Sequence, residues 1–369
     1  MPPRDSQLSA LVALIADATK IVEAHYKKVE AMPYVPSLDD LDAHPLDGVI
    51  AGDKELCTAI QTIEGACSQL CATIARPNHT VLNRFMAGCE LACLRVVMEF
   101  KIADILQESP SSSGLHISAI GKKAGIEEGK LGRVLRLLAS KHIFREVSEN
   151  VFANNRLSMQ LLSSNPLTNL GLHFTDLGLK SAGLLPEVLA DPEWGSSYEA
   201  HHTAFNKYTG FPGKFFEYFE TSEGTKIGAQ FAIGMAGWSD VVKSSAIVQG
   251  YPWGELGQGA SVCDVGGGIG NVTILLAKRF PTLQLKLQDL PERILQARNE
   301  FWPRNCPEAI REKRIEFQSM DFLTESPIKN CNVYLLKNII HDWPDADSIK
   351  ILTGVRKAMA PYRRVLVRE

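Results

Sequence analysis

The sequence lacks both a long apolar run and an excess of charge of one sign. A membrane-spanning helix needs about 20 consecutive apolar residues, and the most apolar stretch near the start, residues 8–26, is interrupted by Asp17 and Lys20. No small-residue cleavage site follows this stretch, so we expect neither a membrane anchor nor a secretory leader. The net charge is only −3, which favours neither nucleic acid nor a membrane surface as a partner.

Metal-ligand spacing is also missing. The chain has eight cysteines, and four of them form the i,i+4 pairs Cys67/Cys71 and Cys89/Cys93 within apolar patterns of helical period. No C-x-x-C occurs and no histidine stands at a matching interval, so we expect no metal. Free cysteines in such patterns behave as small core residues. Their number indicates a reducing compartment, and we expect a cytoplasmic protein.

The length of 369 residues is too great for one small core. Residues 1–165 predict a helical dimerisation and winged-helix domain, in which residues 83–106 have apolar positions at helical intervals and predict one long buried helix. Residues 166–250 predict a helical segment rich in aromatic side chains, which suits a pocket for a flat organic molecule. Residues 251–369 alternate strand and helix, the pattern of a Rossmann-like, doubly wound parallel sheet.

The winged-helix prediction rests on residues 116–154, where two short helices precede two short strands. DNA binding would use basic side chains on the second helix, namely Lys130, Arg133 and Arg136. The acidic residues Glu127 and Glu128 stand at the start of that helix, where phosphates would approach. A scaffold or dimer surface is therefore favoured over DNA binding.

The stretch "VCDVGGGIGN", residues 262–271, ends a predicted strand in a glycine-rich turn. It does not fit the dinucleotide fingerprint G-x-G-x-x-G, because the third glycine is replaced by Asn271 in one register and by Thr273 in the other. No Lys-Ser/Thr pair follows, which excludes a P-loop. The pattern that remains suits a ligand that has no phosphates and carries its own cation. It consists of Asp264, Gly266, Gly268 and Gly270.

Two further acids follow at the ends of the next predicted strands. Asp289 in "LQDLP" is placed to accept the hydroxyls of a ribose, as in other doubly wound nucleoside sites. Asp321 in "MDF" is placed to accept an adenine amine while an apolar neighbour covers the ring. The order of glycine turn, ribose acid and adenine pair indicates S-adenosyl-L-methionine as the ligand.

The stretch "LLKNIIHDWPD" holds the residues suited to chemistry. Lys337 and His341 are four apart, so a helical continuation of the strand would place them on one face. Histidine can accept the proton of a phenol or enol near neutral pH. The alternative for His341 is a helix-cap or core histidine. Asp342 either orients a neighbour or caps a helix, and Trp343 packs on either the cofactor or the core.

These motifs, "DVGGGIG", "QDLP", "MDF" and "LLKNIIHDWPD", resemble those of the plant caffeate-type and fungal small-molecule O-methyltransferases, a class I S-adenosylmethionine-dependent family. The resemblance covers nearly the whole chain and implies a homodimer formed through the N-terminal helices. It also implies three catalytic residues: His341 as general base, Lys337 in contact with the cofactor near its methionine end, and Glu369 beside His341 at the end of the fifth strand. The implied cofactor contacts are Asp264, Gly266, Gly268, Gly270, Asp289, Leu290, Met320, Asp321, Phe322 and Lys337.

The substrate implied by the resemblance is a phenolic or enolic aromatic or polyketide-like small molecule. Candidate pocket residues are His173, Phe215, Phe231, Met235 and Trp238. Some fungal relatives bind the cofactor without transferring the methyl group and act as pericyclases, which is the alternative function. A winged-helix DNA-binding regulator is the third. The family continues beyond Glu369 with a helix and two strands, so we expect either a fragment or strands supplied by a partner.

Overall fold

The computed structural model describes residues 4–48, 53–108, 113–241 and 246–368, and the chain forms two compact units. The N-terminal unit comprises Met1–Gly183 and Phe219–Trp238, and the C-terminal unit comprises Leu184–Tyr218 and Ser239–Glu369. The stretch 166–250, expected as one segment, is thus divided between the two units. Within the described ranges, no helix is long and apolar enough to cross a bilayer.

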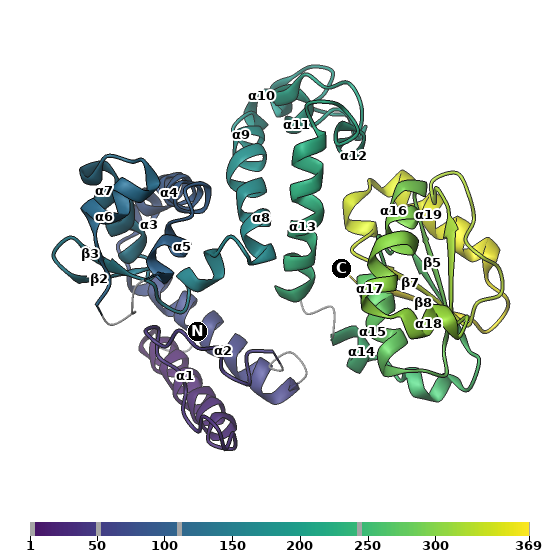
Figure 1. Cartoon of the computed structure of the whole chain (residues 1–369), viewed down its shortest axis with the longest axis horizontal. Coiled ribbons are helices and arrows are strands. Elements are labelled where there is room, and N and C mark those ends of the chain that lie inside the picture. Colours follow the sequence, from purple (N-terminus) through teal and green to yellow (C-terminus); the bar gives the residue numbers. More distant parts are fainter. Residues whose placement is uncertain (1–3, 49–52, 109–112, 242–245, 369) are drawn as a thin grey trace. The chain divides into compact units, whose positions relative to one another are not determined.

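The N-terminal unit begins with two packed helices, α1 (Arg4–Tyr26) and α2 (Lys54–Ile74) (Figure 1). The side chain of Asp53 caps α2 by accepting a hydrogen bond from the backbone N–H of Leu56 at 3.0 Å, which satisfies one of the free donors at the helix start. Ala18 and Leu56 are buried within this pair of helices. Apolar residues that recur at helical period are therefore sufficient to predict the helices α1 and α2.

The prediction of one long buried helix over residues 83–106 is wrong. Three helices occupy this region: α3 (Pro77–Phe85), α4 (Ala87–Glu99) and α5 (Ile102–Gln107). Lys101 ends α4 because it adopts the left-handed backbone conformation, with φ 52°. No residue of α3 is buried, and Phe85 is 76% exposed. Apolar periodicity detected helical faces here, and the face of α3 is on the surface of the unit, whereas α4 and α5 contribute Val97 and Ile102 to the core.

The winged helix is confirmed. Its elements are β1 (Leu115–His116), α6 (Ile117–Ala124), α7 (Glu128–Ala139), β2 (Arg145–Ser148) and β3 (Val151–Ala153), with strand order β1-β3-β2. Glu127 caps α7 by accepting hydrogen bonds from the backbone N–H groups of Gly129 and Lys130. Arg136, one of the three basic residues considered for DNA, instead joins α7 to the wing through Glu146 at 2.9 Å and Asn150 at 2.6 Å.

Two helices of the N-terminal unit approach each other closely: α8 (Pro166–His173) and α13 (Thr225–Val241). Glycines on α13 allow this approach. A Cβ added to Gly234 would lie 2.8 Å from the backbone nitrogen of Leu170, and one added to Gly237 would lie 2.5 Å from that of Leu167. A π-helical turn (Phe174–Gly178) and α9 (Leu179–Ala182) continue α8, and a 3-10 turn (Ser158–Leu161) precedes it.

The C-terminal unit contains a five-stranded sheet in the order β6-β5-β4-β7-β8, and every neighbouring pair is parallel. This confirms the doubly wound fold. The strands are β4 (Ser261–Val265), β5 (Gln284–Asp289), β6 (Ile315–Ser319), β7 (Val333–Lys337) and β8 (Arg364–Arg368). Because β4 pairs with β5 on one side and β7 on the other, the strand order reverses at β4, and ligands bind at such switch points.

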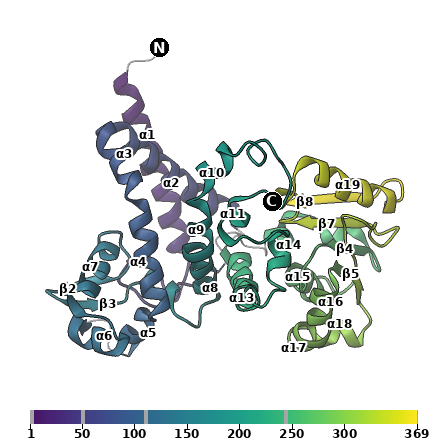
Figure 2. The ribbon, with the colours of Figure 1, turned by 90° about the horizontal axis from the view of Figure 1, so that it is seen from above.

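Alternating residues of these strands bury opposite faces of the sheet. Val262 and Leu335 pack with α15 (Asn271–Arg279) and α16 (Pro291–Gln296), whereas Cys263 and Tyr334 pack with α19 (Asp345–Ala358). Figure 2 shows α16 and α19 on opposite sides of the strands. The remaining helical elements of this unit are α10 (Leu185–Ala190), α11 (Ala204–Thr209), α12 (Phe215–Tyr218), α14 (Ala246–Gly250), η4 (Trp253–Leu256), η5 (Ala297–Phe301), α17 (Trp302–Asn305), α18 (Pro307–Arg311) and η6 (Ile340–Asp342).

Candidate cofactor site and active site

The glycine turn follows β4 and leads into α15. Gly266, Gly268 and Gly270 all have left-handed φ values, of 72°, 61° and 91°, which other residues adopt only with strain. A Cβ on Gly266 would lie 2.6 Å from Cδ1 of Ile339, so this glycine is also required by close packing. By contrast, a Cβ built on Gly268 would have no other atom within 4 Å. The turn is therefore packed on one side and open at its middle glycine.

Asp289 at the end of β5 is tied to this turn. Its Oδ2 accepts a hydrogen bond from the backbone N–H of Gly268 and its Oδ1 accepts one from Leu290, each at 2.7 Å. Burial raises the pKa of this carboxyl, and the two backbone donors act against that shift. Asp289 thus occupies the position at the carboxyl end of the second strand where doubly wound folds bind ribose hydroxyls.

Asp264 at the end of β4 lies beneath the turn. Its side chain is so close to Gly267 that a Cβ there would lie 2.6 Å from Oδ2. The hydroxyl of Thr273 donates to the same oxygen at 2.5 Å. Burial raises the pKa of Asp264 to about 6, and the charge of Asp289 adds to this effect, whereas Thr273 and the ammonium of Lys337 oppose it. The influence of Lys337 indicates that the end of β7 lies near the glycine turn.

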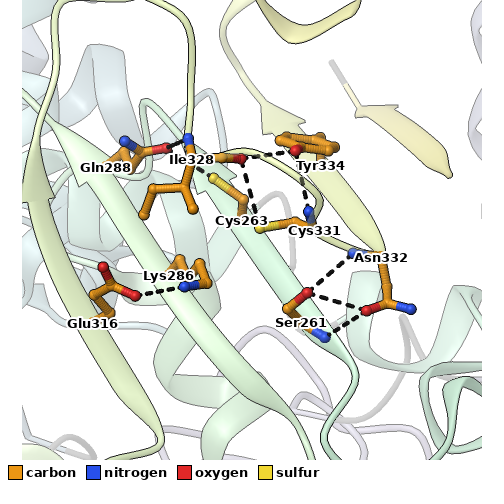
Figure 3. Close-up of polar contacts among 9 residues, drawn as sticks. All are labelled: Ser261, Cys263, Lys286, Gln288, Glu316, Ile328, Cys331, Asn332 and Tyr334. Atoms are coloured by element: carbon orange, nitrogen blue, oxygen red, sulfur yellow. Dashed lines mark hydrogen bonds and ion pairs between the residues drawn. The ribbon is translucent and has the colours of Figure 1, made fainter. Parts of the chain in front are cut away.

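Gln288 supports the turn from below, a role that the sequence analysis missed. Its carbonyl oxygen accepts hydrogen bonds from the backbone N–H groups of Gly266 at 2.8 Å and Gly267 at 3.3 Å. Its side-chain Oε1 accepts from the backbone N–H of Ile328 at 2.8 Å and from Sγ of Cys263 at 3.0 Å (Figure 3). Polar and apolar residues alternate along "LQLKLQD", so no local signal in the sequence distinguishes Gln288 from the other polar residues.

The three residues of "MDF" have different environments. Strand β6 ends at Ser319, one residue before the motif. Met320 is buried in the core beneath α19. Asp321 accepts hydrogen bonds from the backbone of Leu323 at 2.9 Å and the hydroxyl of Thr324 at 3.0 Å, so it also caps a turn. Phe322 borders the glycine turn, because its Cε1 lies 3.0 Å from a Cβ built on Gly266.

The expectation that a helix places Lys337 and His341 on one face is wrong. Lys337 is the last residue of β7, and Asn338 then adopts a left-handed conformation with φ 55°. His341 follows in the short 3-10 turn η6, where its side chain is 42% exposed. Nε2 of His341 lies 3.4 Å from Oδ1 of Asp342. A turn at the carboxyl edge of the sheet, not a helix, therefore carries the candidate base.

Trp343 follows this turn and belongs to the surroundings of the site. Its ring contacts that of Phe322 edge-on, with centroids 5.6 Å apart. The ammonium of Lys214 lies 5.9 Å from the centroid of the Trp343 ring. Together with Ile339, which packs on Gly266, the two aromatic rings form an apolar border beside the glycine turn. Trp343 also packs against the buried cluster beneath α19, which is the core packing considered for it, and packing on the cofactor stays a prediction.

The predicted pocket residues are divided between the units. In the N-terminal unit, His173 contacts the ring of Phe231 with centroids 5.0 Å apart, and burial lowers the pKa of His173. Met235 and Trp238 are half-buried on α13 of the same unit. In the C-terminal unit, Phe215 contacts Phe205 edge-on at 5.1 Å.

Two further expectations concern Glu369 and metals. Glu369, expected beside His341, lies outside the described residues. Among the residues that the structure describes, no group of three or more His, Cys, Asp and Glu side chains is arranged to hold a metal ion.

Comparisons with known proteins agree with this architecture. Residues 194–369 match the O-methyltransferase domain model, and residues 79–164 match the O-methyltransferase dimerisation domain model. The chain is 40% identical over 368 residues to 3-O-methyltransferase 2 of Phanerochaete chrysosporium, and the alignment covers 100% of this chain and 80% of that protein. It is 36% identical over 383 residues to an O-methyltransferase of Armillaria gallica, covering 99% and 80% of the two chains.

Solved structures show the same fold. The mitomycin 7-O-methyltransferase MmcR is similar with a TM-score of 0.64 and 25% identity, covering 79% of each chain. The complex of LepI with S-adenosylmethionine has a TM-score of 0.70 with 21% identity, covering 86% of this chain and 79% of that one, so it shows the fold alone.

The residues of the C-terminal unit fit the cofactor of this family. The open position at Gly268 leaves room for a ligand against bare backbone; the carboxyl group of Asp289 lies beside that opening and that of Asp264 is buried beneath the turn. Such a site favours a nucleoside that carries a positive charge over one that carries phosphates. With its domain matches and its relatives, the chain belongs to the S-adenosyl-L-methionine-dependent O-methyltransferases.

Proposed function

We propose that the enzyme methylates the hydroxyl oxygen of a phenolic or enolic small molecule, with His341 as the general base. The observation that carries this proposal is the position of His341 in an exposed turn at the carboxyl edge of β7. This is the edge at which the glycine turn and Asp289 lie, and doubly wound sheets bind their ligands there. Oxygen nucleophiles of this kind become reactive when they lose a proton.

The chain's own groups can hold and move that proton. Nε2 of His341 accepts it from the substrate hydroxyl, and the imidazolium that forms is 3.4 Å from Oδ1 of Asp342, a favourable electrostatic contact. The cofactor, when bound, supplies a methyl group on a positively charged sulfur. Lys337 at the end of β7 adds a fixed positive charge near the turn. The protein's contribution is thus positioning together with a base.

The residues that surround the glycine turn would make the contacts with the cofactor. Gly266, Gly268 and Gly270 would face the amino-acid part, with Asp264 beneath them. Asp289 and Leu290 would bind the ribose, in agreement with the fixed carboxylate of Asp289. The adenine would lie by Met320, Asp321 and Phe322, and the edge-on contact of Phe322 with Trp343 supports an apolar surface there.

Aromatic side chains in each unit suit a flat, weakly polar substrate. Phe215 lies within a cluster of rings in the C-terminal unit, and His173 lies among the rings of the N-terminal unit. Burial lowers the pKa of His173, which disfavours its charged form. The free state of all eight cysteines supports a cytoplasmic location.

We further propose a homodimer formed through the helices of the dimerisation domain. The segment from the end of α2 to α4 exposes a group of large apolar side chains. These are Ile74, Val81, Leu82, Phe85, Met86 and Leu91. Exposed apolar side chains in such number are typical of a surface that binds another protein, and all but Ile74 lie at the start of the region matching the dimerisation model.

The test of the activity is methyl transfer from labelled cofactor to a panel of phenols, followed by mass spectrometry. We expect products heavier by one methyl group, and we expect His341→Gln to lower kcat about 100-fold or more. Cofactor binding by that variant should be unchanged in calorimetry. Products with the mass of the substrate, or of the substrate less water, would instead indicate a cyclase. Full activity of His341→Gln would remove His341 from the role of base.

A further inference from the structure

The turn between α11 and α12 is held in place by one buried side chain. Asn206 is 2% exposed, and its Nδ2 donates hydrogen bonds to the carbonyl oxygens of Phe211 at 2.8 Å and Gly213 at 2.7 Å. A Cβ on Gly213 would lie 2.6 Å from Oε2 of Glu217, so the chain is closely packed at this point. Lys214, the next residue, therefore extends from a backbone whose position is fixed.

The ammonium of Lys214 lies at the aromatic border of the candidate site. It is 5.9 Å from the centroid of the Trp343 ring, and Trp343 in turn contacts the ring of Phe322 edge-on. Phe322 borders the glycine turn, and Trp343 directly follows η6, the 3-10 turn that contains His341. Lys214 thus places a positive charge beside two aromatic rings that adjoin both the cofactor turn and the turn of the candidate base.

The acids nearest to this ammonium in the chain have other contacts. Oε2 of Glu217 accepts a hydrogen bond from the backbone N–H of Lys214 at 2.9 Å, and Oδ1 of Asp342 lies 3.4 Å from Nε2 of His341. Among the residues that the structure describes, no carboxylate lies within 4.0 Å of the Lys214 ammonium. An ammonium that has aromatic rings beside it and no ionic partner is suited to bind an anion carried by an aromatic molecule.

We propose that Lys214 is a specificity-determining residue that binds the carboxylate of a phenolic acid, whose ring packs against Phe322 and Trp343. This inference rests on the proposed methylation of a phenol at this site, and it adds the charge of that phenol. A carboxylate gains a charge-assisted hydrogen bond from the ammonium and matches its single charge. A phosphate carries nearly two charges, and the second would be left unpaired beside an apolar surface. Lys214 takes no part in moving the proton.

The test uses pairs of ligands that differ mainly in charge. Calorimetry measures the binding of 2,4-dihydroxybenzoate and 2,4-dihydroxybenzamide, and of a dihydroxynaphthoate and its amide, to the full chain saturated with S-adenosylhomocysteine. Because acid and amide have nearly the same size and the same hydroxyl groups, the ratio of their Kd values reports the contribution of the charge. For the ring that fits better, we expect the acid to bind about tenfold more tightly than the amide at low salt. The ratio should fall to about threefold in about 0.5 M salt. A wild-type chain that binds neither acid more tightly than its amide would overturn the inference.

Three variants identify the residue that recognises the charge. Lys214→Met removes the ammonium and keeps most of the length of the side chain, so the ratio should fall to about one while the affinity for the amide is retained. Lys214→Arg should keep a preference for the acid. Lys207→Met is the matched control, because the ammonium of Lys207 lies 5.1 Å from the centroid of Trp194 and pairs with Asp191 at 3.0 Å in the same unit. It should keep the full preference. A preference that survives in Lys214→Met, or that is lost equally in Lys207→Met, would contradict the assignment.

Two further measurements separate this inference from a cofactor role of Lys214 and from the proposed function. Lys214→Met should bind S-adenosylhomocysteine with unchanged Kd. A Kd raised about tenfold or more would assign the ammonium to the carboxylate of the cofactor and would overturn the inference. Methyl transfer from labelled cofactor to neutral phenols depends on His341 and should not require Lys214. If transfer is absent while acids are still preferred in binding, the proposed function fails and the role of Lys214 in recognition stands.

Discussion

The indole Nε1–H of Trp302 donates a hydrogen bond to the carbonyl oxygen of Ile269 at 3.0 Å. The same nitrogen lies 2.7 Å from the position of a Cβ on Gly270. Trp302 is fully buried at the start of α17, and its ring fixes the last part of the glycine turn from the side of the core. The conformation of the turn thus depends on a residue that is 33 positions away in the sequence.

Trp302→Phe tests this relationship. Loss of the indole donor leaves a buried carbonyl without its partner and a smaller ring in the core, so we expect a loss of roughly 2 kcal/mol in the free energy of unfolding. Because the affected carbonyl is in the turn, the Kd for S-adenosylmethionine should also rise several-fold. Urea unfolding and calorimetry measure the two effects.

Trp253→Phe is the matched control for Trp302→Phe. Trp253 is also buried, and its Nε1–H donates to the carbonyl oxygen of Ile247 at 2.8 Å, but neither residue belongs to the glycine turn. This variant should lose a similar amount of stability and keep its cofactor affinity. Equal loss of affinity in both variants would show that Trp302 acts only through general stability.

The sequence predicted those parts of the fold that depend on local patterns. The strand before Gly266, the glycine turn and Asp289 at the end of β5 were placed correctly, because their residue types are required by backbone geometry and by the βαβ order, whereas Asp321 lies in a turn beyond the end of β6. Residues Gln288, Thr273 and Trp302 were missed as supports of the turn. Their contacts join different elements of the fold, and no local pattern encodes such contacts.

The two wrong expectations about helices have a common cause. In residues 83–106 and in the segment from Lys337 to His341, apolar or polar residues recur at helical spacing. A residue in the left-handed conformation interrupts each pattern, Lys101 in the first and Asn338 in the second. The first pattern is also broken at Met86, between α3 and α4. Periodicity describes which residues would share a face if the helix continued, and it does not detect the residue at which the backbone turns.

The dimer proposal leads to a prediction about Phe85. Its side chain is 76% exposed on α3, so a charged residue there has little effect on the fold of one chain. We expect Phe85→Glu to convert a dimer into a monomer in sedimentation velocity, since a buried charge at the interface would have no partner. Tyr198→Glu, at a position that is 86% exposed in the C-terminal unit, is the control and should remain dimeric. A dimeric Phe85→Glu protein would place the interface elsewhere.

The buried carboxyl of Asp264 predicts how the stability of the cofactor-free protein varies with pH. Its pKa is about 6 in the folded chain and near the ordinary value of 3.8 when the chain is unfolded, so the folded state binds more protons between these two pH values. The contribution of Asp264 to the free energy of unfolding is fully present below about pH 4 and is lost as the pH rises through about 6. The Asp264→Asn protein has no charge at this position. Its free energy of unfolding should therefore exceed that of the parent by roughly 2 kcal/mol at about pH 7.5, and the two proteins should differ little at about pH 4. Urea unfolding at several pH values, followed by tryptophan fluorescence, measures this difference. If it does not change with pH, Asp264 is ionised in the folded chain throughout, and its charge is stabilised by more than the hydroxyl of Thr273.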